Sequence, residues 1–383
     1  MKIVSVLEEG KLGGPQIYLI NLVVGGVEFS DDNLFLIPRD NSNNFQEKLK
    51  QKGIRFRLLP LTRITKEKLV ALRYILFFPL EIVLLAISFR RHRADIIYVA
   101  GGSWQFKGIL ASKLARIPVL WHLNDTSMPA FILWIFRALS RFGDGFIFAS
   151  KRSKHYYEPL ISNDRPRFVI PSSVDTRVFC RGYVSRSFSD EVIPSHWEGK
   201  VVVGLVGNPS PVKGIEVFIR MAAEVNSKIA NVQFAILGNV FSNQQRYFDS
   251  LQALIIKLGI DNVDFLGGCD DVRPFLERFD IYVCSSLSES SPISVWEAMA
   301  MELPVVSTDV GDVPEYVRDG ECGYICPVGD HKSLARHVCE LVVDEPMRKR
   351  LGKSARAKVV SELDVRACAE KHFEAYRAVL RAN

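Results

Sequence analysis

The chain has 383 residues, of which 48% are hydrophobic and 24% are charged, and its formal net charge is +6. This composition excludes a disordered, collagen-like or disulfide-stapled chain, and the length favours two domains of ordinary size. The seven cysteines are scattered and form no zinc-ligand pattern, so we expect reduced thiols, as in the cytoplasm, and no metal site. The first residues read directly as a strand, without a signal-peptide pattern.

The positive charge is concentrated in the first half of the chain. Met1 to Ser185 contains 27 basic and 15 acidic residues, a net charge of +12, whereas the remainder contains 22 and 28, a net charge of −6. Such asymmetry favours an anionic partner for the first half, either a membrane surface or a phosphate-bearing acceptor. We find no nucleic-acid recognition motif and expect no nucleic-acid partner.

The chain opens with a strand over residues 2–7, a turn containing Gly13 and Gly14, and a helix over residues 16–24. Paired glycines let a backbone approach a ligand closely, although an ordinary strand-to-helix turn uses the same residues. Further strands at 33–38 and 55–59 indicate alternating β and α units. The absence of a G-x-G-x-x-G motif argues against a dinucleotide-binding dehydrogenase.

Residues 69–89 form a long apolar segment that approaches transmembrane length. Pro79 and Glu81 interrupt it, and a strand over residues 95–99 follows almost at once, so we expect a buried or interfacial helix instead of a span. Its aromatic residues and the basic run Arg90-Arg91-His92-Arg93 favour partial insertion into an anionic bilayer surface.

His122 follows the predicted strand over residues 118–121. A lone histidine is more often structural than catalytic, but open α/β sheets bind ligands at the carboxyl ends of their strands. A helix over 131–142 and strands over 146–150 and 168–171 complete the first half. The polar stretch after residue 184 predicts a first domain over 1–184, a linker over 185–199, a second domain over 200–360 and a final helix over 361–383.

The second half begins with a strand over residues 201–207, followed by Asn208 and the turn Lys213-Gly214. This turn is not a P-loop, because the lysine precedes the glycine and no Ser or Thr follows in the required order. A strand over 232–237 ends in a second glycine turn at Gly238.

The stretch from Ser286 to Glu297 carries the strongest chemical signal. Glu289 lies in the loop after a buried strand over 280–284, and Glu297 lies in a helix that begins near Pro292. The backbone N–H groups of Ser290, Ser291 and Ile293 would cluster at the helix N-terminus, which favours anions such as phosphate. Two carboxylates flanking such a site suggest a phosphorylated, hydroxyl-rich ligand, although two solvated glutamates are the plainer alternative.

The surrounding sequence resembles a known family. Seven residues separate Glu289 from Glu297, Ala298-Met299-Ala300 follows, and the runs 303–315 and 319–324 continue the pattern. This is similar to the nucleotide-sugar-binding half of family 4 retaining glycosyltransferases, specifically over residues 201–338 and weakly over the first 180. The resemblance implies the GT-B fold: two doubly wound, Rossmann-like α/β domains facing a cleft, with the acceptor on the first, the donor on the second, and the last helix returning to the first.

The resemblance also implies roles for individual residues. Lys213 would contact the donor phosphates, Glu297 the ribose hydroxyls and Glu289 the donor sugar, while His122 would face the reacting sugar and acceptor. Many family members have an arginine where this chain has Asn208. The candidate catalytic residues are His122, Lys213 and Glu289, and the candidate donor-binding residues are Gly13, Gly14, Asn208, Lys213, Gly238, Ser290, Ser291, Ile293 and Glu297.

The expected activity is sugar transfer with retention, without a metal ion or other cofactor, from a UDP- or GDP-sugar. The acceptor would be a saccharide, lipid-linked, of a cell-surface polysaccharide such as lipopolysaccharide. The protein would be cytoplasmic and touch the inner face of the membrane. A nucleotide-sugar 2-epimerase of the same fold is one alternative, and a non-catalytic nucleotide-sugar-binding subunit, suggested by Asn208, is another.

Overall fold

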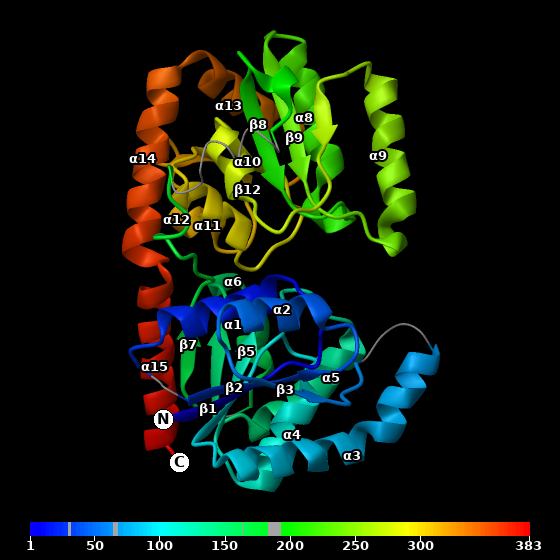
Figure 1. The fold of residues 1–383 in the computed structure, drawn as a ribbon, viewed down its shortest axis with the longest axis vertical. Coiled ribbons are helices and arrows are strands. Elements are labelled where there is room, and N and C mark those ends of the chain that lie inside the picture. Colours follow the sequence, from blue (N-terminus) through cyan, green and yellow to red (C-terminus); the bar gives the residue numbers. More distant parts are fainter. Residues whose placement is uncertain (30–31, 64–67, 163, 183–192) are drawn as a thin grey trace. The chain divides into compact units, whose positions relative to one another are not determined.

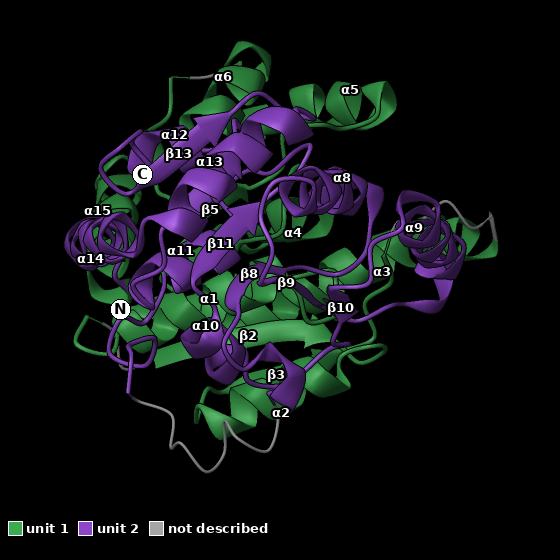
Figure 2. Ribbon diagram, turned by 90° about the horizontal axis from the view of Figure 1, so that it is seen from above, with its two compact units in different colours: residues 1–173, 365–383 green, residues 174–364 purple. Residues whose placement is uncertain are grey.

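The computed structural model describes residues 1–29, 32–63, 68–162, 164–182 and 193–383 (Figure 1). The chain divides into two compact units, which Figure 2 shows in different colours. The first unit comprises Met1–Ser173 and Val365–Asn383, and the second comprises Val174–Asp364. Each unit is built on one parallel sheet.

The sheet of the first unit has seven strands in the order β3-β2-β1-β4-β5-β6-β7. Every pair is parallel, and the order reverses direction between β1 and β4, which is the switch point of a doubly wound sheet. The strands are β1 (Lys2–Val6), β2 (Asp32–Pro38), β3 (Phe56–Leu59), β4 (Ile96–Val99), β5 (Val119–Leu123), β6 (Gly145–Phe148) and β7 (Arg167–Val169).

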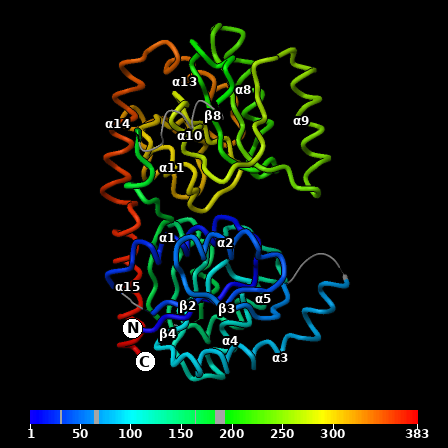
Figure 3. The backbone as a smooth tube through the Cα atoms, viewed as in Figure 1, coloured from blue at the N-terminus to red at the C-terminus, as the bar shows by residue number. Residues whose placement is uncertain are grey.

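Helices cover both faces of this sheet, because successive strand side chains point to opposite faces and both sets are apolar. One core lies under α1, α2 and α15, and the other lies under α3 to α6. The last helix, α15, packs against α1 (Figure 3). The helices are α1 (Gly14–Gly25), α2 (Asn43–Gln51), α3 (Lys68–His92), α4 (Phe106–Ala115), α5 (Ala130–Leu139), α6 (Lys151–Tyr157) and α15 (Val365–Arg381), with short 3₁₀ turns at Ser140–Phe142 and Glu158–Leu160.

The sheet of the second unit has six parallel strands in the order β10-β9-β8-β11-β12-β13. Its switch point lies between β8 and β11. The strands are β8 (Val201–Val206), β9 (Val232–Leu237), β10 (Val263–Phe265), β11 (Ile281–Cys284), β12 (Val305–Thr308) and β13 (Gly323–Cys326). Both units therefore have the doubly wound α/β architecture that the sequence predicts.

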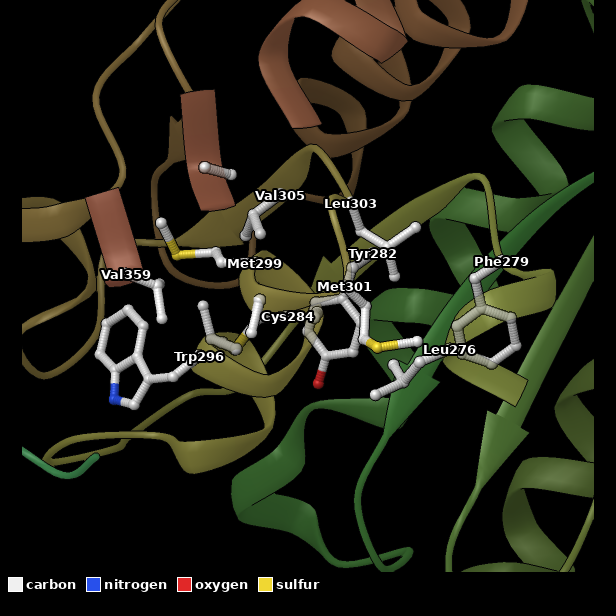
Figure 4. Packing of buried hydrophobic residues seen from close by; sticks show 14 of the residues in the cluster. Leu276, Phe279, Tyr282, Cys284, Trp296, Met299, Met301, Leu303, Val305 and Val359 are labelled. Atoms are coloured by element: carbon white, nitrogen blue, oxygen red, sulfur yellow. The ribbon is translucent and has the colours of Figure 1, made fainter. Parts of the chain in front are cut away.

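The second unit also has a core on each face of its sheet. Trp296 and Met299 of α11 pack in the core that contains Tyr282 and Cys284 of β11 (Figure 4). The opposite core lies under α8, α9 and α13. The helices are α8 (Ile215–Asn226), α9 (Gln245–Leu258), α10 (Arg273–Arg278), α11 (Ile293–Ala300), α12 (Val313–Tyr316), α13 (His331–Val343) and α14 (Glu345–Glu362), with 3₁₀ turns at Ser195–Trp197, Pro211–Lys213 and Ser242–Gln244.

The division between the units falls earlier than the predicted linker. Val174 pairs with Asp364 as an isolated β-bridge, and Trp197 is fully buried in the core of the second unit, so residues 174–182 and 193–199 belong to that unit. Residues 185–192 of the predicted linker lie outside the described residues. The final helix begins at Val365 and belongs with the first unit.

Candidate active site

Lys213 and Glu289 meet at the switch point of the second sheet. Lys213 ends the 3₁₀ turn that follows β8, and Glu289 lies in the loop that follows β11, the strand paired with β8. The Lys213 Nζ atom lies 2.6 Å from Glu289 Oε1. Carboxyl ends at a switch point are where open α/β sheets bind ligands. The structure therefore brings two of the predicted catalytic residues into direct contact.

Gly214 makes this contact possible. Its φ is +59°, and a Cβ atom there would lie 2.0 Å from the carbonyl oxygen of Ser285. The hydroxyl of Ser285 also donates to the carbonyl oxygen of Lys213, over 3.1 Å. Only glycine allows both the left-handed backbone and the close approach. The Lys-Gly turn is thus needed to seat the lysine against the loop after β11.

Burial and pairing act in opposite directions on Lys213. Burial lowers the pKa of the ammonium, but the charge of Glu289 and the hydrogen bond to it outweigh that effect and raise the pKa above its usual value. Ser286 Oγ donates a second hydrogen bond to Glu289 Oε1, over 2.9 Å. The lysine therefore stays charged at neutral pH, beside a carboxylate held by two donors.

The loop between β11 and α11 is fixed by its neighbour, the loop after β12. Thr308 Oγ1 donates to the carbonyl oxygen of Ser286 over 2.6 Å, and Asp312 N donates to the carbonyl oxygen of Ser290 over 3.0 Å. Ser291 Oγ accepts a hydrogen bond from Trp296 Nε1. Ser290 and Ser291 are thus held at the start of α11, where the sequence places an anion site.

The helix α11 begins at Ile293, with Pro292 in the N-cap position and no side-chain cap. The loop over residues 285–292 joins the carboxyl end of β11 to the amino end of this helix. Uncapped N–H groups and the helix dipole favour an anion there. The phosphate contacts predicted for Ser290, Ser291 and Ile293 stay a prediction.

Glu297 differs from Glu289 in its surroundings. It lies in α11, is partly buried, and has no side-chain hydrogen bond or ion pair with the described residues. Burial, and secondarily the charge of Asp271, raise its pKa to about 8. Asp271 itself is paired with Arg273. A carboxyl group with spare acceptor capacity suits a hydroxyl-bearing ligand.

Asn208 and Gly238 form adjoining turns after β8 and β9. Asn208 Oδ1 accepts a hydrogen bond from Asn239 N over 2.8 Å. A Cβ atom at Gly238 would lie 2.3 Å from the carbonyl oxygen of Gly207. Asn208 therefore ties the two turns together, a contact that an arginine side chain has no acceptor to make.

Gly13 and Gly14 occupy the start of α1, directly after the loop that follows β1. Gly13 has an extended backbone with φ −163°, and a Cβ atom at Gly14 would meet no atom within 4 Å. Neither glycine is required by the backbone or by protein packing. Their predicted role, close approach to a ligand, stays a prediction.

His122 lies within β5 and is only 1% exposed. Its side chain points to the face covered by α1 and α15, where Tyr18 packs on the imidazole with a centroid separation of 4.6 Å. Tyr98 Oη lies 2.8 Å from His122 Nδ1, whereas His122 Nε2 has no hydrogen-bond partner among the described residues. The ring is thus held between strand and helices, and not in the loop beyond the strand.

A second histidine, His372 of α15, completes this cluster. His372 Nδ1 lies 2.9 Å from the carbonyl oxygen of Cys368, which can only accept, so the Nδ1 atom carries the proton. Tyr18 Oη then donates to His372 Nε2 over 2.8 Å. Because Tyr18 supplies the donor to His372 Nε2, the Tyr98 hydroxyl is favoured to donate to His122 Nδ1. The proton of the neutral His122 ring then lies on Nε2. Burial, and secondarily the charge of His372, hold the pKa of His122 well below its usual value.

Several of these partners were not predicted from the sequence. Ser286, Thr308, Tyr98 and His372 acquire their roles only through contacts across the fold; Tyr98 and His372 are 274 residues apart. Asp312 lies in the run 303–315, in which the sequence predicts no role for it, and it is buried beside the loop after β11. Among the described residues, no group of three or more His, Cys, Asp or Glu is placed to hold a metal ion.

Comparison with known proteins extends these observations. Residues 189–358 match the family model of glycosyl transferases group 1. The lipopolysaccharide core biosynthesis mannosyltransferase LpcC of Rhizobium leguminosarum is 25% identical over 269 residues, 69% of this chain and 73% of that protein. The N,N'-diacetylbacillosaminyl-diphospho-undecaprenol alpha-1,3-N-acetylgalactosaminyltransferase of Campylobacter jejuni is 24% identical over 389 residues, 96% of this chain and 97% of that protein. Several other relatives match over less than half of their own length.

The fold has solved counterparts as well. The structure of Anabaena HepE in complex with UDP and glucose superposes with a TM-score of 0.83 and 24% identity, and the match covers 98% of each chain.

Proposed function

We propose that this chain transfers a sugar from a nucleotide-sugar to a saccharide acceptor with retention of anomeric configuration, because residues 189–358 match the family model of glycosyl transferases group 1. The observation that carries the proposal is the Lys213–Glu289 pair at the switch point of the second sheet. A cation beside an uncapped helix end fits a diphosphate, and the adjoining carboxylates fit sugar and ribose hydroxyls.

The names of the relatives favour a cell-surface saccharide. LpcC is named for lipopolysaccharide core biosynthesis, and the Campylobacter protein for a diphospho-undecaprenol acceptor. The proposed acceptor is therefore a lipid-linked saccharide of a cell-surface polysaccharide. HepE is described with UDP and glucose, which favours a UDP-hexose donor here, with a GDP-sugar as the other candidate. We place the protein in the cytoplasm, in peripheral contact with the inner face of the membrane.

The proposed donor contacts follow the geometry of the second unit. The diphosphate lies against Lys213 and the amino end of α11, exchanging the lysine's bond to Glu289 for bonds to phosphate. Glu289 then turns to hydroxyls of the donor sugar, and Glu297 accepts from the ribose hydroxyls. The roles that the sequence predicts for Gly13, Gly14 and His122 of the first unit stay predictions.

The proposed chemistry takes place on one face of the sugar. The bond between the anomeric carbon and the phosphate oxygen breaks, the acceptor oxygen bonds to the same face, and the acceptor proton passes to the leaving phosphate. Lys213 neutralises the charge that develops on that phosphate, without a metal ion or another cofactor. A double displacement is disfavoured, because it needs a carboxylate on the opposite face of the anomeric carbon.

Ligand-dependent melting tests the donor site first. Ligands that bind only the folded state raise the melting temperature, so UDP, GDP and a panel of UDP- and GDP-sugars are compared. We expect one nucleotide class to stabilise the protein and the Lys213→Met variant to lose that stabilisation. No stabilisation by any member of the panel would reject the proposed donor site.

Product analysis tests the reaction itself. The stabilising donor is incubated with and without lipid-linked saccharides, and the products are examined by NMR. We expect a glycoside with the anomeric configuration of the donor, formed only when acceptor is present. An epimerised nucleotide-sugar formed from the donor alone would instead identify a 2-epimerase.

A further inference from the structure

The helix α3 exposes a continuous apolar stripe. Leu69, Leu72, Leu76, Leu80 and Val83 recur at intervals of three or four residues and are all exposed, Leu69 by 78%. Residues at these intervals lie on one face of a helix. Ile87 extends the stripe, and Ile75 and Phe77 flank it. Exposed apolar patches of this kind mark interaction sites.

The opposite side of α3 packs against the rest of the first unit. Leu85, Ala86 and Phe89 are buried in its core, and Glu81, although in the middle of an apolar helix, is only 1% exposed. The Glu81 carboxylate lies 2.5 Å from the ammonium of Lys107 on α4. This buried ion pair and the packed second half fix which face of the helix points outward.

The same arrangement bears on whether α3 spans a membrane. Among the described residues, α3 is long and apolar enough to do so, and 22% of its most apolar window is buried. A spanning helix could not keep Glu81 and Phe89 in the core of a unit built on a parallel sheet. The amino-terminal turns of α3 project from the rest of the first unit (Figure 1).

The charges along the stripe have one sign. Arg73 lies within it, and Arg91 continues it at the carboxyl end; both are exposed. Neither arginine has a carboxylate partner among the described residues, and the only acidic residue of α3 is the buried Glu81. The stripe is therefore apolar with cationic side chains and no exposed anion.

A second helix in the same layer has a similar face. Helices α3 and α5 both pack against α4 and contribute to the same core, so their outer faces point away from the sheet. On α5, Phe131 and Trp134 are exposed, Trp134 by 74%. Arg137 and Arg141 follow at helical spacing and are exposed as well. Aromatic and basic residues together are typical of membrane-interface helices.

We propose that the outer faces of α3 and α5 form a docking surface for anionic phospholipid bilayers. The proposal rests on the proposed function in that a lipid-linked acceptor lies in such a bilayer. An apolar stripe without exposed acids, whose arginines have no carboxylate partner among the described residues, complements the negatively charged interface of such a bilayer.

Vesicle flotation of the full chain tests the proposal. The vesicles contain phosphatidylcholine alone or mixed with phosphatidylglycerol. We expect binding to the mixed vesicles that is at least tenfold stronger and that weakens with salt. The variant Leu72→Glu/Leu80→Glu should lose this binding, whereas Ile256→Glu, at a position of α9 that is 80% exposed, should retain it.

Fluorescence adds a readout of the surface itself. Trp134 is the most exposed of the five tryptophans. Mixed vesicles should therefore shift the emission to the blue, and Trp134→Phe should abolish the shift. Wild-type protein that ignores mixed vesicles, or a glutamate variant that binds them equally well, would overturn the proposal.

Two further outcomes separate this inference from others. If the stripe instead mediates self-association, Leu72→Glu/Leu80→Glu will abolish a concentration-dependent dimer while the wild type fails to float with vesicles, which also overturns the proposal. Nucleotide-sugar melting shifts are recorded on the same samples. Intact shifts without vesicle binding reject the docking surface alone, whereas vesicle binding without shifts rejects the proposed donor site alone.

Discussion

The titratable groups near the carboxyl edges of the two sheets differ in their charge. In the second unit, Lys213 and Glu289 are charged partners within 2.6 Å, reached from the loops after β8 and β11. In the first unit, His122 and His372 are buried and neutral; burial lowers the pKa of His372 to about 4 and that of His122 well below its usual value. The second unit thus holds charged groups at this edge, and the first holds buried, neutral hydrogen-bonding groups.

This difference indicates a division of labour. Charge that is pre-positioned and partly shielded from water stabilises a charge that develops during a reaction. A neutral imidazole held by tyrosines can orient a hydroxyl but cannot neutralise a diphosphate. If the division is real, removing a charge from the second unit should reduce the rate more than removing a hydrogen bond from the first.

The largest effect is expected for Lys213→Met. The variant keeps the length of the side chain but loses the cation beside the leaving phosphate, so kcat/KM should fall about 10²–10³-fold, as for loss of one transition-state donor. Initial rates of transfer measure it. As a matched control, Lys228→Met removes an exposed lysine paired with Glu224 and should leave the rate unchanged. Equal rates for Lys213→Met and wild type would remove the proposed role.

Glu289→Gln should have the next largest effect. The amide keeps the shape but loses the charge, and a hydrogen bond to a charged group contributes about 1.5–3 kcal/mol, or roughly 10–100-fold in kcat. Nucleotide affinity should stay close to that of the wild type, because Glu289 is assigned to the sugar. Calorimetric titration with UDP or GDP and transfer rates separate the two. Glu345→Gln, which breaks an exposed pair with Lys349, is the control. Parallel losses of affinity and rate would speak against the assignment.

Tyr98→Phe tests the neutral edge. It removes the hydroxyl that lies 2.8 Å from His122 Nδ1. A neutral hydrogen bond contributes about 1 kcal/mol, so kcat should fall about fivefold with little change in nucleotide affinity. The ¹⁵N NMR signals of His122 should also change, since Nδ1 loses its donor. Tyr376→Phe alters another buried tyrosine of the same core and should leave both readouts unchanged. A change in stability without a change in the His122 signals would make Tyr98 merely structural.

The sequence predicts those structural features that depend on residues close together in the chain. Short apolar runs predict the strands of both sheets, and the family motif, confirmed by the match to glycosyl transferases group 1, predicts the loops that hold Lys213 and Glu289. A buried strand that is apolar on both faces does not reveal which helix covers which face. The burial of His122 beside α1 and α15 was therefore not predictable, because α15 comes from the far end of the chain.

The same limit explains the remaining differences. Lys213 pairs directly with Glu289 because β8 and β11 are neighbours in the sheet. The sequence of neither segment predicts which strands lie side by side. The division at Val174 depends on its bridge to Asp364, 190 positions later in the numbering of the chain. Asn208 departs from the family pattern, and only its bond to Asn239 shows what its side chain does instead.

The last effect concerns Glu297 and the pH dependence of stability and nucleotide binding. Burial raises the pKa of Glu297 to about 8, so its contribution to stability is fully present below its ordinary value of 4.5 and is lost as the pH rises through 8. The histidines of the first unit act oppositely, since their lowered pKa values make the contribution present above about 6.5 and lost on acidification.

A ribose hydroxyl needs the ionised carboxylate of Glu297, so nucleotide affinity should rise about fivefold between about pH 7 and pH 8. Titration calorimetry across this range measures the slope. Glu297→Gln should bind more weakly with a flat profile, and a variant that keeps the wild-type slope would assign the titration to another group.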